Sequence, residues 1–372
     1  METKKKGFPT AFWVCACTEI FERLAYYLGR SLILIFVTAS VATGGLGLSD
    51  TVAANMQSNL TAFSYLLPLF GAVIVDKYIG ARYTTPVGMF IAAAGYFTGG
   101  IAKSSAGVYA MIFLVSLGLA LFKNGAIIGR VITDKSQMDP AFSMRYTLVN
   151  VGAFIGTFLV GILYKDVFAK DGVIGFGPCF KMAALMMVLG GLWYIFVCWR
   201  FLGDLGKLPF KKTLTEEEKA AEAKKKEETG TKQPLTTIEK KRIAAIFVAP
   251  LFSIVFWIFW YLGYMPVYFY WAVNMDWVVA GYQVPSTWFD AANSLFCVIL
   301  GPVTAALWKK LAARPQGDMS LFRKTGLGIA IIGVGYLFYA AIDIMRGGEK
   351  ASVLWLIVFA FLLTMGEMFF SP

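Results

Sequence analysis

The first membrane-length segment of the chain, residues 9–42, reads PTAFWVCACTEIFERLAYYLGRSLILIFVTASVA. It is apolar over more than the roughly 20 residues that a helix needs to cross a bilayer. Three lysines precede it, and the apolar run continues well past the length of a signal peptide. We therefore expect this segment to remain in the membrane as a helix.

The rest of the chain has a similar composition. Apolar residues make up 58% of the 372 residues, charged residues make up 15%, and the mean hydropathy is +0.65. A water-soluble surface normally carries more charge than this. Apolar runs predict an all-α integral membrane protein with spans at approximately 9–42, 51–75, 83–101, 106–129, 142–164, 177–200, 243–272, 284–308, 321–343 and 351–372.

The placement of the positive charges predicts the orientation. If the N-terminus is cytoplasmic, most of the 34 lysines and arginines fall in cytoplasmic segments, including Arg130 and Arg145. This agrees with the positive-inside rule, so the net charge of +11 needs no nucleic-acid partner. We expect a multi-pass protein of the plasma membrane, in a bacterium the inner membrane.

One long polar stretch, about 203–241, separates the first six spans from the last four and mixes acidic with basic runs. It predicts three parts: an N-terminal six-helix bundle at 1–202, a cytoplasmic linker at 203–241, and a C-terminal bundle at 242–372. Because a six-helix half needs two more helices after span ten, we expect this second bundle to be truncated. Glycines at glycophorin-like spacing, Gly95/Gly99 and Gly152/Gly156, predict close helix packing.

Several classes of chemistry are disfavoured. The chain has no histidine, the commonest metal ligand and general base, and its five cysteines form no C-x-x-C pair. No nucleophile and base stand together in the sequence either. We therefore expect no metal, no cofactor and no enzymatic activity.

Charged residues inside the predicted spans are the strongest functional signal: Glu19, Glu22, Arg23 and Arg30 in span one, Lys123 in span four, and Glu367 in span ten. Each costs at least about 2.5 kcal/mol near the bilayer centre, so each needs a partner or a water-filled cavity. The alternative is structural: ion pairs that fix helix packing, or an arginine that reaches the headgroups.

The charges of span one share a face with a tyrosine. Glu19, Glu22, Arg23, Tyr26 and Arg30 follow the helical repeat within a sector about 100° wide. Two carboxylates beside an arginine at low dielectric can hold a proton near neutral pH. This stripe predicts a proton-binding face on a cavity, without histidine.

The same residues carry a resemblance to a known family. Glu19-Ile-Phe-Glu22-Arg23-Leu-Ala-Tyr26-Tyr27 resembles the E-x-x-E-R-F-x-Y-Y signature of the proton-dependent oligopeptide transporter (POT) family, which belongs to the major facilitator superfamily. Four further segments agree in order: Gly71 to Arg82, Lys123-Asn124, Phe142 to Gly152, and Gly366 to Pro372. The resemblance implies a major facilitator fold that transports its substrate by alternating access.

The resemblance also implies roles for individual residues. Proton coupling is expected at Glu19, Glu22, Arg23 and Lys123, and a cytoplasmic gate at Asp76 and Arg82. Arg30 and Lys123 are expected to face the carboxylate of a peptide, and Glu367 its amino group. Further expected substrate contacts are Tyr26, Tyr27, Tyr65, Asn150, Trp257, Tyr261, Asn293 and Ser371.

One position departs from the family pattern. Peptide-transporting members usually carry an acid after the Phe-Trp of span seven, where this chain has Tyr261. That acid is expected to pair with Arg30, and a tyrosine does not titrate near neutrality.

Taken together, the motifs predict a monomer that moves small peptides with protons across the bilayer. Uptake of nitrate or another small anion, or a non-transporting receptor or scaffold, remain the alternatives.

Overall fold

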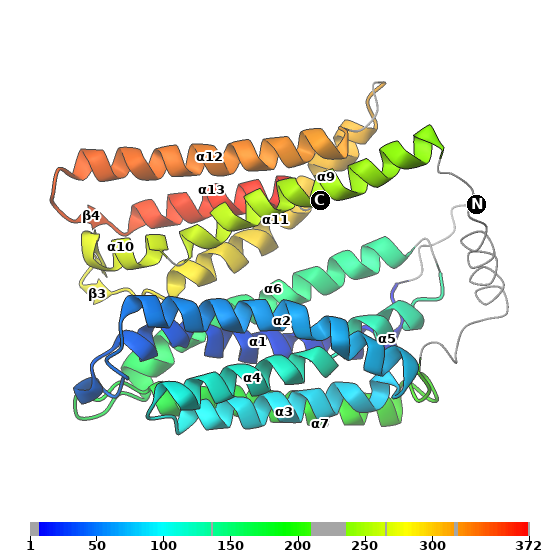
Figure 1. The fold of residues 1–372 in the computed structure, drawn as a ribbon, viewed down its shortest axis with the longest axis horizontal. Helices are drawn as coiled ribbons and strands as arrows, with labels where there is room; N and C mark the ends of the chain where they lie inside the picture. The colour runs from blue at the N-terminus through cyan, green and yellow to red at the C-terminus, as the bar shows by residue number, and fades with distance from the viewer. Residues whose placement is uncertain (1–6, 135–136, 210–235, 265, 316–318, 371–372) are drawn as a thin grey trace.

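The computed structural model describes residues 7–134, 137–209, 236–264, 266–315 and 319–370, and its main elements are α-helices (Figure 1). The first half consists of α1 (Thr10–Thr38), η1 (Val41–Thr43), α2 (Asp50–Lys77), α3 (Ala81–Gly100), α4 (Ser105–Leu121), α5 (Asn124–Val131), α6 (Met138–Ile162), η3 (Leu163–Val167) and α7 (Phe176–Arg200).

The second half has fewer helices and four very short strands. It consists of α9 (Thr237–Gly263), α10 (Pro266–Asn274), β1 (Met275–Asp276), β2 (Val278–Val279), β3 (Tyr282–Gln283), α11 (Trp288–Ala312), α12 (Leu321–Arg346), β4 (Ala351–Ser352) and α13 (Leu354–Phe370). β1 pairs with β4 in parallel, and β2 pairs with β3 in an antiparallel hairpin. Ala280 and Gly281 have φ of 50° and 80°, as a two-residue hairpin turn of type I′ requires.

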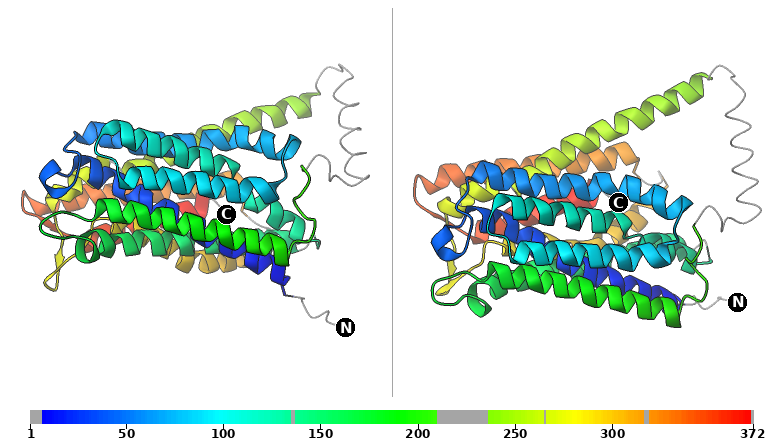
Figure 2. Two further views of the ribbon diagram at one scale, coloured as in Figure 1. Left: turned by 90° about the horizontal axis from the view of Figure 1, so that it is seen from below. Right: turned by 60° about the horizontal axis from the view of Figure 1, so that its bottom comes forward.

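The two halves form two groups of nearly parallel helices. In Figure 1 the first half lies below and the second half above, and Figure 2 shows the same arrangement from other sides. Each half has its own buried apolar cluster, one between α1 and α7 and one between α9 and α13. α6 of the first half packs against α11 of the second half.

Helices occupy all ten predicted spans, but two of the spans are interrupted. Span four is divided into α4 and α5, because Phe122 and Lys123 leave the helical conformation. Span seven is divided into α9 and α10. Of the described helices, seven are long and apolar enough to cross a membrane, and α13 is a shorter apolar helix. The chain is a multi-pass membrane protein.

The exposed side chains agree with a lipid environment. Along α9, the exposed residues Ile246, Phe247 and Leu251 are apolar, and Figure 2 shows the start of this helix projecting away from the other helices.

α9 begins with a capping box, in which the side chains of Thr236 and Glu239 accept hydrogen bonds from backbone N–H groups at the helix start. The predicted linker 203–241 lies mostly outside the described residues.

Several contacts between the two halves lie at the end of the molecule that contains β3, opposite the end where α9 begins (Figure 1). The indole Nε1 of Trp288 donates to the carbonyl of Phe158 at 3.0 Å, and their rings stack. Nearby, the Tyr282 hydroxyl donates to Asp166 at 3.2 Å, and Lys165 Nζ donates to the carbonyl of Gln283 at 3.0 Å. The halves are therefore held together most firmly at this end, which we call the contact end.

The glycine pairs of the sequence lie at close helix crossings. A Cβ atom on Gly152 would lie 2.8 Å from the carbonyl oxygen of Ile20, and one on Gly156 would lie 2.5 Å from that of Leu24. Both glycines thus let α6 approach α1. Because α1 carries the charged stripe, this crossing fixes the position of the stripe relative to α6.

Gly156→Ala is expected to destabilise the protein by about 1–3 kcal/mol, because the methyl group overlaps the α1 backbone. Thermal unfolding of the detergent-purified protein measures this. Gly301→Ala is the matched control, since a Cβ atom there meets nothing within 4 Å. A Gly156 variant as stable as the Gly301 variant would contradict the close packing.

Candidate substrate and proton site

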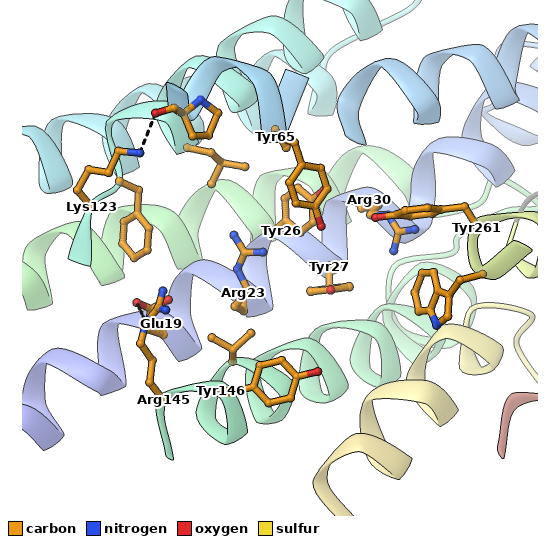
Figure 3. Close-up of a pocket in the computed structure, with 16 residues that line it drawn as sticks. Glu19, Arg23, Tyr26, Tyr27, Arg30, Tyr65, Lys123, Arg145, Tyr146 and Tyr261 are labelled. Atoms are coloured by element: carbon orange, nitrogen blue, oxygen red, sulfur yellow. Dashed lines mark hydrogen bonds and ion pairs between the residues drawn. The ribbon is translucent and has the colours of Figure 1, made fainter. Parts of the chain in front are cut away.

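A cavity of about 350 Å³ lies between the two halves (Figure 3). α1 contributes the largest share of its wall, and α2, the α4–α5 break, α6 and α9 supply the rest. Its lining residues are Glu19, Arg23, Tyr26, Tyr27, Arg30, Ser64, Tyr65, Pro68, Leu119, Phe122, Lys123, Arg145, Tyr146, Val149, Trp260 and Tyr261. We call this space the central cavity.

The structure brings eight of the predicted site residues together in the central cavity. They are Glu19, Arg23, Tyr26, Tyr27, Arg30, Tyr65, Lys123 and Tyr261. Figure 3 shows the α1 residues following one side of that helix, with Lys123 and Tyr261 toward opposite ends of the cavity. The amphipathic stripe predicted from helical spacing therefore does face a common space.

Glu19 is held by partners on two other helices. Its side chain is buried and accepts hydrogen bonds from Arg145 Nε at 2.8 Å and from Asn124 Nδ2 at 3.1 Å. Arg145, counted among the charges of the cytoplasmic segments, lies on α6 and lines the cavity. In the sequence, the feature that could have indicated a role for Arg145 in the site is its position within the Phe142 to Gly152 motif.

Glu22 does not line the central cavity. It is fully buried, and the Arg23 guanidinium donates to both of its carboxylate oxygens. The single cluster expected for the two acids is thus two separate ion pairs, Glu19 with Arg145 and Glu22 with Arg23. Arg23 connects its pair to the cavity, where its guanidinium also lies 4.8 Å from the Tyr26 ring centroid.

Lys123 lies at the interruption between α4 and α5. Its half-buried ammonium group donates to the carbonyl of Pro68 at 3.0 Å, and its backbone N–H donates to Thr85. Neither acid of α1 is within hydrogen-bonding distance of this ammonium group among the described contacts. Asp76 on α2 is the acid that interacts with its charge.

Arg30 is buried near the other end of the cavity, with the ring of Tyr27 5.8 Å from its guanidinium carbon. Tyr261, which stands where the family pattern has an acid, lines the cavity together with Tyr65 of α2. The two tyrosines thus belong to opposite halves and face the same space. Tyr261 therefore contributes an uncharged wall to the cavity from the second half.

Glu367 lies behind the cavity wall and is surrounded by donors. Trp260 Nε1 and Asn293 Nδ2 each donate to it at 3.1 Å, and the Tyr146 hydroxyl donates at 3.4 Å. Asn293 donates also to Thr364 at 2.9 Å. Two of these donors, Tyr146 and Trp260, line the central cavity, so the carboxylate is one side chain away from it.

The other predicted residues lie outside the central cavity. Asn150 is bonded to the backbone of Tyr146 one turn earlier on α6, and Trp257 packs edge-on against Trp260. Arg82 donates to the carbonyls of Cys198 and Gly203 rather than to Asp76, so the described contacts do not form the expected gate pair. Ser371 lies outside the described residues.

No metal-binding chemistry is visible in the described part of the chain. It contains no group of three or more His, Cys, Asp or Glu side chains that could hold an ion. All five cysteines are free, and four of them are buried. The cavity instead offers cations, aromatic rings and hydrogen-bonding groups, which suit an organic anion or zwitterion.

Comparison with known proteins agrees with the motifs. The model of the POT family matches residues 200–372. Along 98% of the chain, the sequence is 24% identical to an uncharacterised transporter, YclF, of Bacillus subtilis (strain 168), covering 80% of that protein. The chain is thus similar to the POT family.

Other relatives extend the likeness to named peptide transporters. The chain is 24% identical to the peptide transporter YePEPT of Yersinia enterocolitica, over 95% of the chain and 78% of the relative. It is 23% identical to a di-/tripeptide transporter of Lactococcus lactis subsp. cremoris, over 98% of the chain and 82% of the relative.

Solved structures confirm the predicted fold. A POT family transporter in complex with 5-aminolevulinic acid superimposes with a TM-score of 0.85 at 22% identity, covering 99% of this chain and 83% of the other. The peptide transporter POT in complex with sulfate gives a TM-score of 0.79 at 23% identity, covering 100% and 82%.

Proposed function

We propose that this chain imports di- or tripeptides together with protons by alternating access. The observation that carries the proposal is the unequal charge of the central cavity. Its lining contains the cations Arg23, Arg30, Lys123 and Arg145 but a single carboxylate, Glu19. A second carboxylate, Glu367, stands behind the wall formed by the second half. Such a cavity suits a zwitterion that spans the two halves.

The size of the cavity supports a small solute. A volume of about 350 Å³ is at the lower end of the roughly 300–1,000 Å³ that is usual for small-molecule sites. Tyrosines and Trp260 supply surfaces for side chains of varied shape. In this proposal the N-terminus and the linker are cytoplasmic, and the contact end faces outward. We propose a monomer as the transporting unit.

Uptake of labelled dialanine into proteoliposomes under an inward proton gradient tests the function. We expect accumulation above the external concentration, competition by unlabelled dipeptides, and no competition by nitrate at the same concentration. The cationic lining also suits a small anion, so competition by nitrate alone would favour anion uptake instead. A folded protein that accumulates neither solute would favour a receptor or scaffold.

Glu367→Gln is expected to weaken the binding of zwitterionic peptides more than that of their N-acetylated forms, because only the zwitterionic peptides present an ammonium group to this carboxylate. A hydrogen bond to a charged group contributes about 1.5–3 kcal/mol, or roughly tenfold to a hundredfold in affinity. Competition of dialanine and N-acetyl-dialanine against labelled substrate measures the difference. Equal losses for the two peptides would remove Glu367 from recognition of the amino group.

A further inference from the structure

Two cations of the central cavity are neutralised within the protein. Arg145 Nε donates to Glu19 at 2.8 Å, and the Arg23 guanidinium donates to both carboxylate oxygens of Glu22. All four groups belong to α1 and α6 in the first half. Each pair has no net charge, so neither arginine requires an anion from outside the protein.

The other two cations of the cavity, Arg30 and Lys123, have no such partner. Among the described residues, no carboxylate forms an ion pair with either of them. Lys123 Nζ donates to the carbonyl of Pro68 at 3.0 Å, which uses one of its three N–H donors. The ring of Tyr27 lies 5.8 Å from the guanidinium carbon of Arg30. The positive charge of the cavity is therefore concentrated on Arg30 and Lys123.

Two acids act on these cations from outside the cavity. Asp290 of α11 interacts with the charge of Arg30, and Asp76 of α2 interacts with that of Lys123. Arg30 and Lys123 line the central cavity, whereas neither acid does. The side of each cation that faces the cavity thus remains open to an anion.

Arg30 and Lys123 lie toward opposite ends of the cavity (Figure 3). Asn124, the neighbour of Lys123, donates to Glu19 at 3.1 Å, so Lys123 lies near the level of Glu19 along α1. Arg30 follows Glu19 by 11 residues, which corresponds to about 16 Å along the helix. Two separate anionic groups of one solute can therefore meet these two cations.

We propose that the preferred substrates of the central cavity are acidic peptides, that is, di- or tripeptides with a carboxylate in a side chain in addition to the one at the C-terminus. One carboxylate would bind Arg30 and the other Lys123, each through charge-assisted hydrogen bonds. The amino group remains available to Glu367. The inference rests on the proposed function, which it narrows from small peptides in general to acidic ones.

The dimensions agree with such a substrate. An extended dipeptide is about 7 Å long, and a glutamate at its first position places the side-chain carboxylate and the C-terminal carboxylate on different residues. The long side chains of Arg30 and Lys123 reach toward it from the two ends. The cavity volume of about 350 Å³ has room for a solute of this size.

Tyr261 contributes to this preference because it carries no charge. It lines the cavity from the second half and lies beside Arg30 in Figure 3. A tyrosine stays neutral at physiological pH. A carboxylate at this position would neutralise Arg30 from the cavity side and repel a carboxylate of the substrate. The hydroxyl of Tyr261 leaves the guanidinium available instead.

The test compares two dipeptides of nearly the same shape, glutamyl-alanine and glutaminyl-alanine, which differ by one negative charge. Their affinities for the purified protein are measured by thermal stabilisation at pH 7 and constant ionic strength, because a ligand that binds the folded state raises its apparent stability. We expect glutamyl-alanine to bind about tenfold more tightly, as one additional hydrogen bond to a charged group allows.

Two variants should lose this preference by different routes. Lys123→Gln removes one of the cations, and Tyr261→Glu supplies Arg30 with a carboxylate from the protein itself. In both, the affinities for the two peptides should become nearly equal. Tyr261→Gln is the neutral counterpart and should keep the preference. Lys77→Gln removes an exposed lysine at the end of α2 and should also keep it.

Equal affinities of the unchanged protein for the two peptides, or no stabilisation by either, would overturn the inference. A preference that persists in Tyr261→Glu would overturn it as well, and this variant decides alone if Lys123→Gln does not fold. Failure of the proposed function is seen separately in proteoliposomes. A protein that prefers glutamyl-alanine in the binding assay but accumulates neither peptide under an inward proton gradient would retain the acidic preference and exclude proton-driven import.

Discussion

Lys123→Ala is expected to abolish proton-driven uptake. The interruption between α4 and α5 places this ammonium group in the wall of the central cavity. The other described lining residues from α4 and the interruption, Leu119 and Phe122, are uncharged. Alanine removes a cation that can bind a substrate carboxylate and that responds to the charge of Asp76. Uptake of labelled dialanine into proteoliposomes under an inward proton gradient measures the effect.

Two comparisons separate this loss from misfolding. Lys77→Ala removes an exposed lysine at the end of α2 and should leave uptake unchanged. Lys123→Arg keeps the charge but not the shape of the group, and should retain part of the activity. If the alanine variant concentrated dialanine at a normal rate, Lys123 would have no part in coupling.

Glu22→Gln is expected to abolish gradient-driven accumulation while substrate exchange continues. Glu22 is fully buried and holds the Arg23 guanidinium with both oxygens, and Arg23 in turn lines the central cavity. Glutamine keeps the shape but can neither carry the charge nor accept a proton. Exchange needs alternating access without net proton movement, so counterflow of dialanine should persist.

The structural alternative makes a different prediction. If the Glu22–Arg23 pair only stabilises the fold, removing one partner from a buried pair costs about 3–5 kcal/mol. Accumulation and counterflow would then be lost together, with a broadened size-exclusion profile. Glu349→Gln, an exposed acid beyond α12, is the control and should retain both activities. A folded Glu22→Gln protein that still accumulates dialanine would exclude Glu22 from coupling.

The sequence could predict features that depend on helical repeats and composition. The spans follow from apolar runs, and the shared face of Glu19, Arg23, Tyr26 and Arg30 follows from 3.6 residues per turn. The structure confirms that these side chains line one space. The glycine spacing likewise predicted close helix crossings because only a missing side chain permits them.

Features that depend on how separate helices meet could not be predicted in this way. The helix break at Phe122 and Lys123 is followed by Asn124-Gly125, a turn-favouring pair that marks it only weakly within a long apolar run. The pairing of Glu19 with Arg145 joins residues far apart in sequence, as does the hydrogen bond from Asn293 to Glu367. Nothing in the spacing of α1 shows that Glu22 points away from the cavity while Glu19 points into it.

The gathering of contacts at one end gives the molecule the geometry of a lever. A helix of 25 residues, such as α6 or α11, is about 37 Å long at 1.5 Å per residue. If the halves pivot about contacts near one end, a rotation of about 10° displaces the far end by roughly 6 Å, given that length. A change the size of one side chain at the contact end is thereby amplified into an opening the size of a small solute.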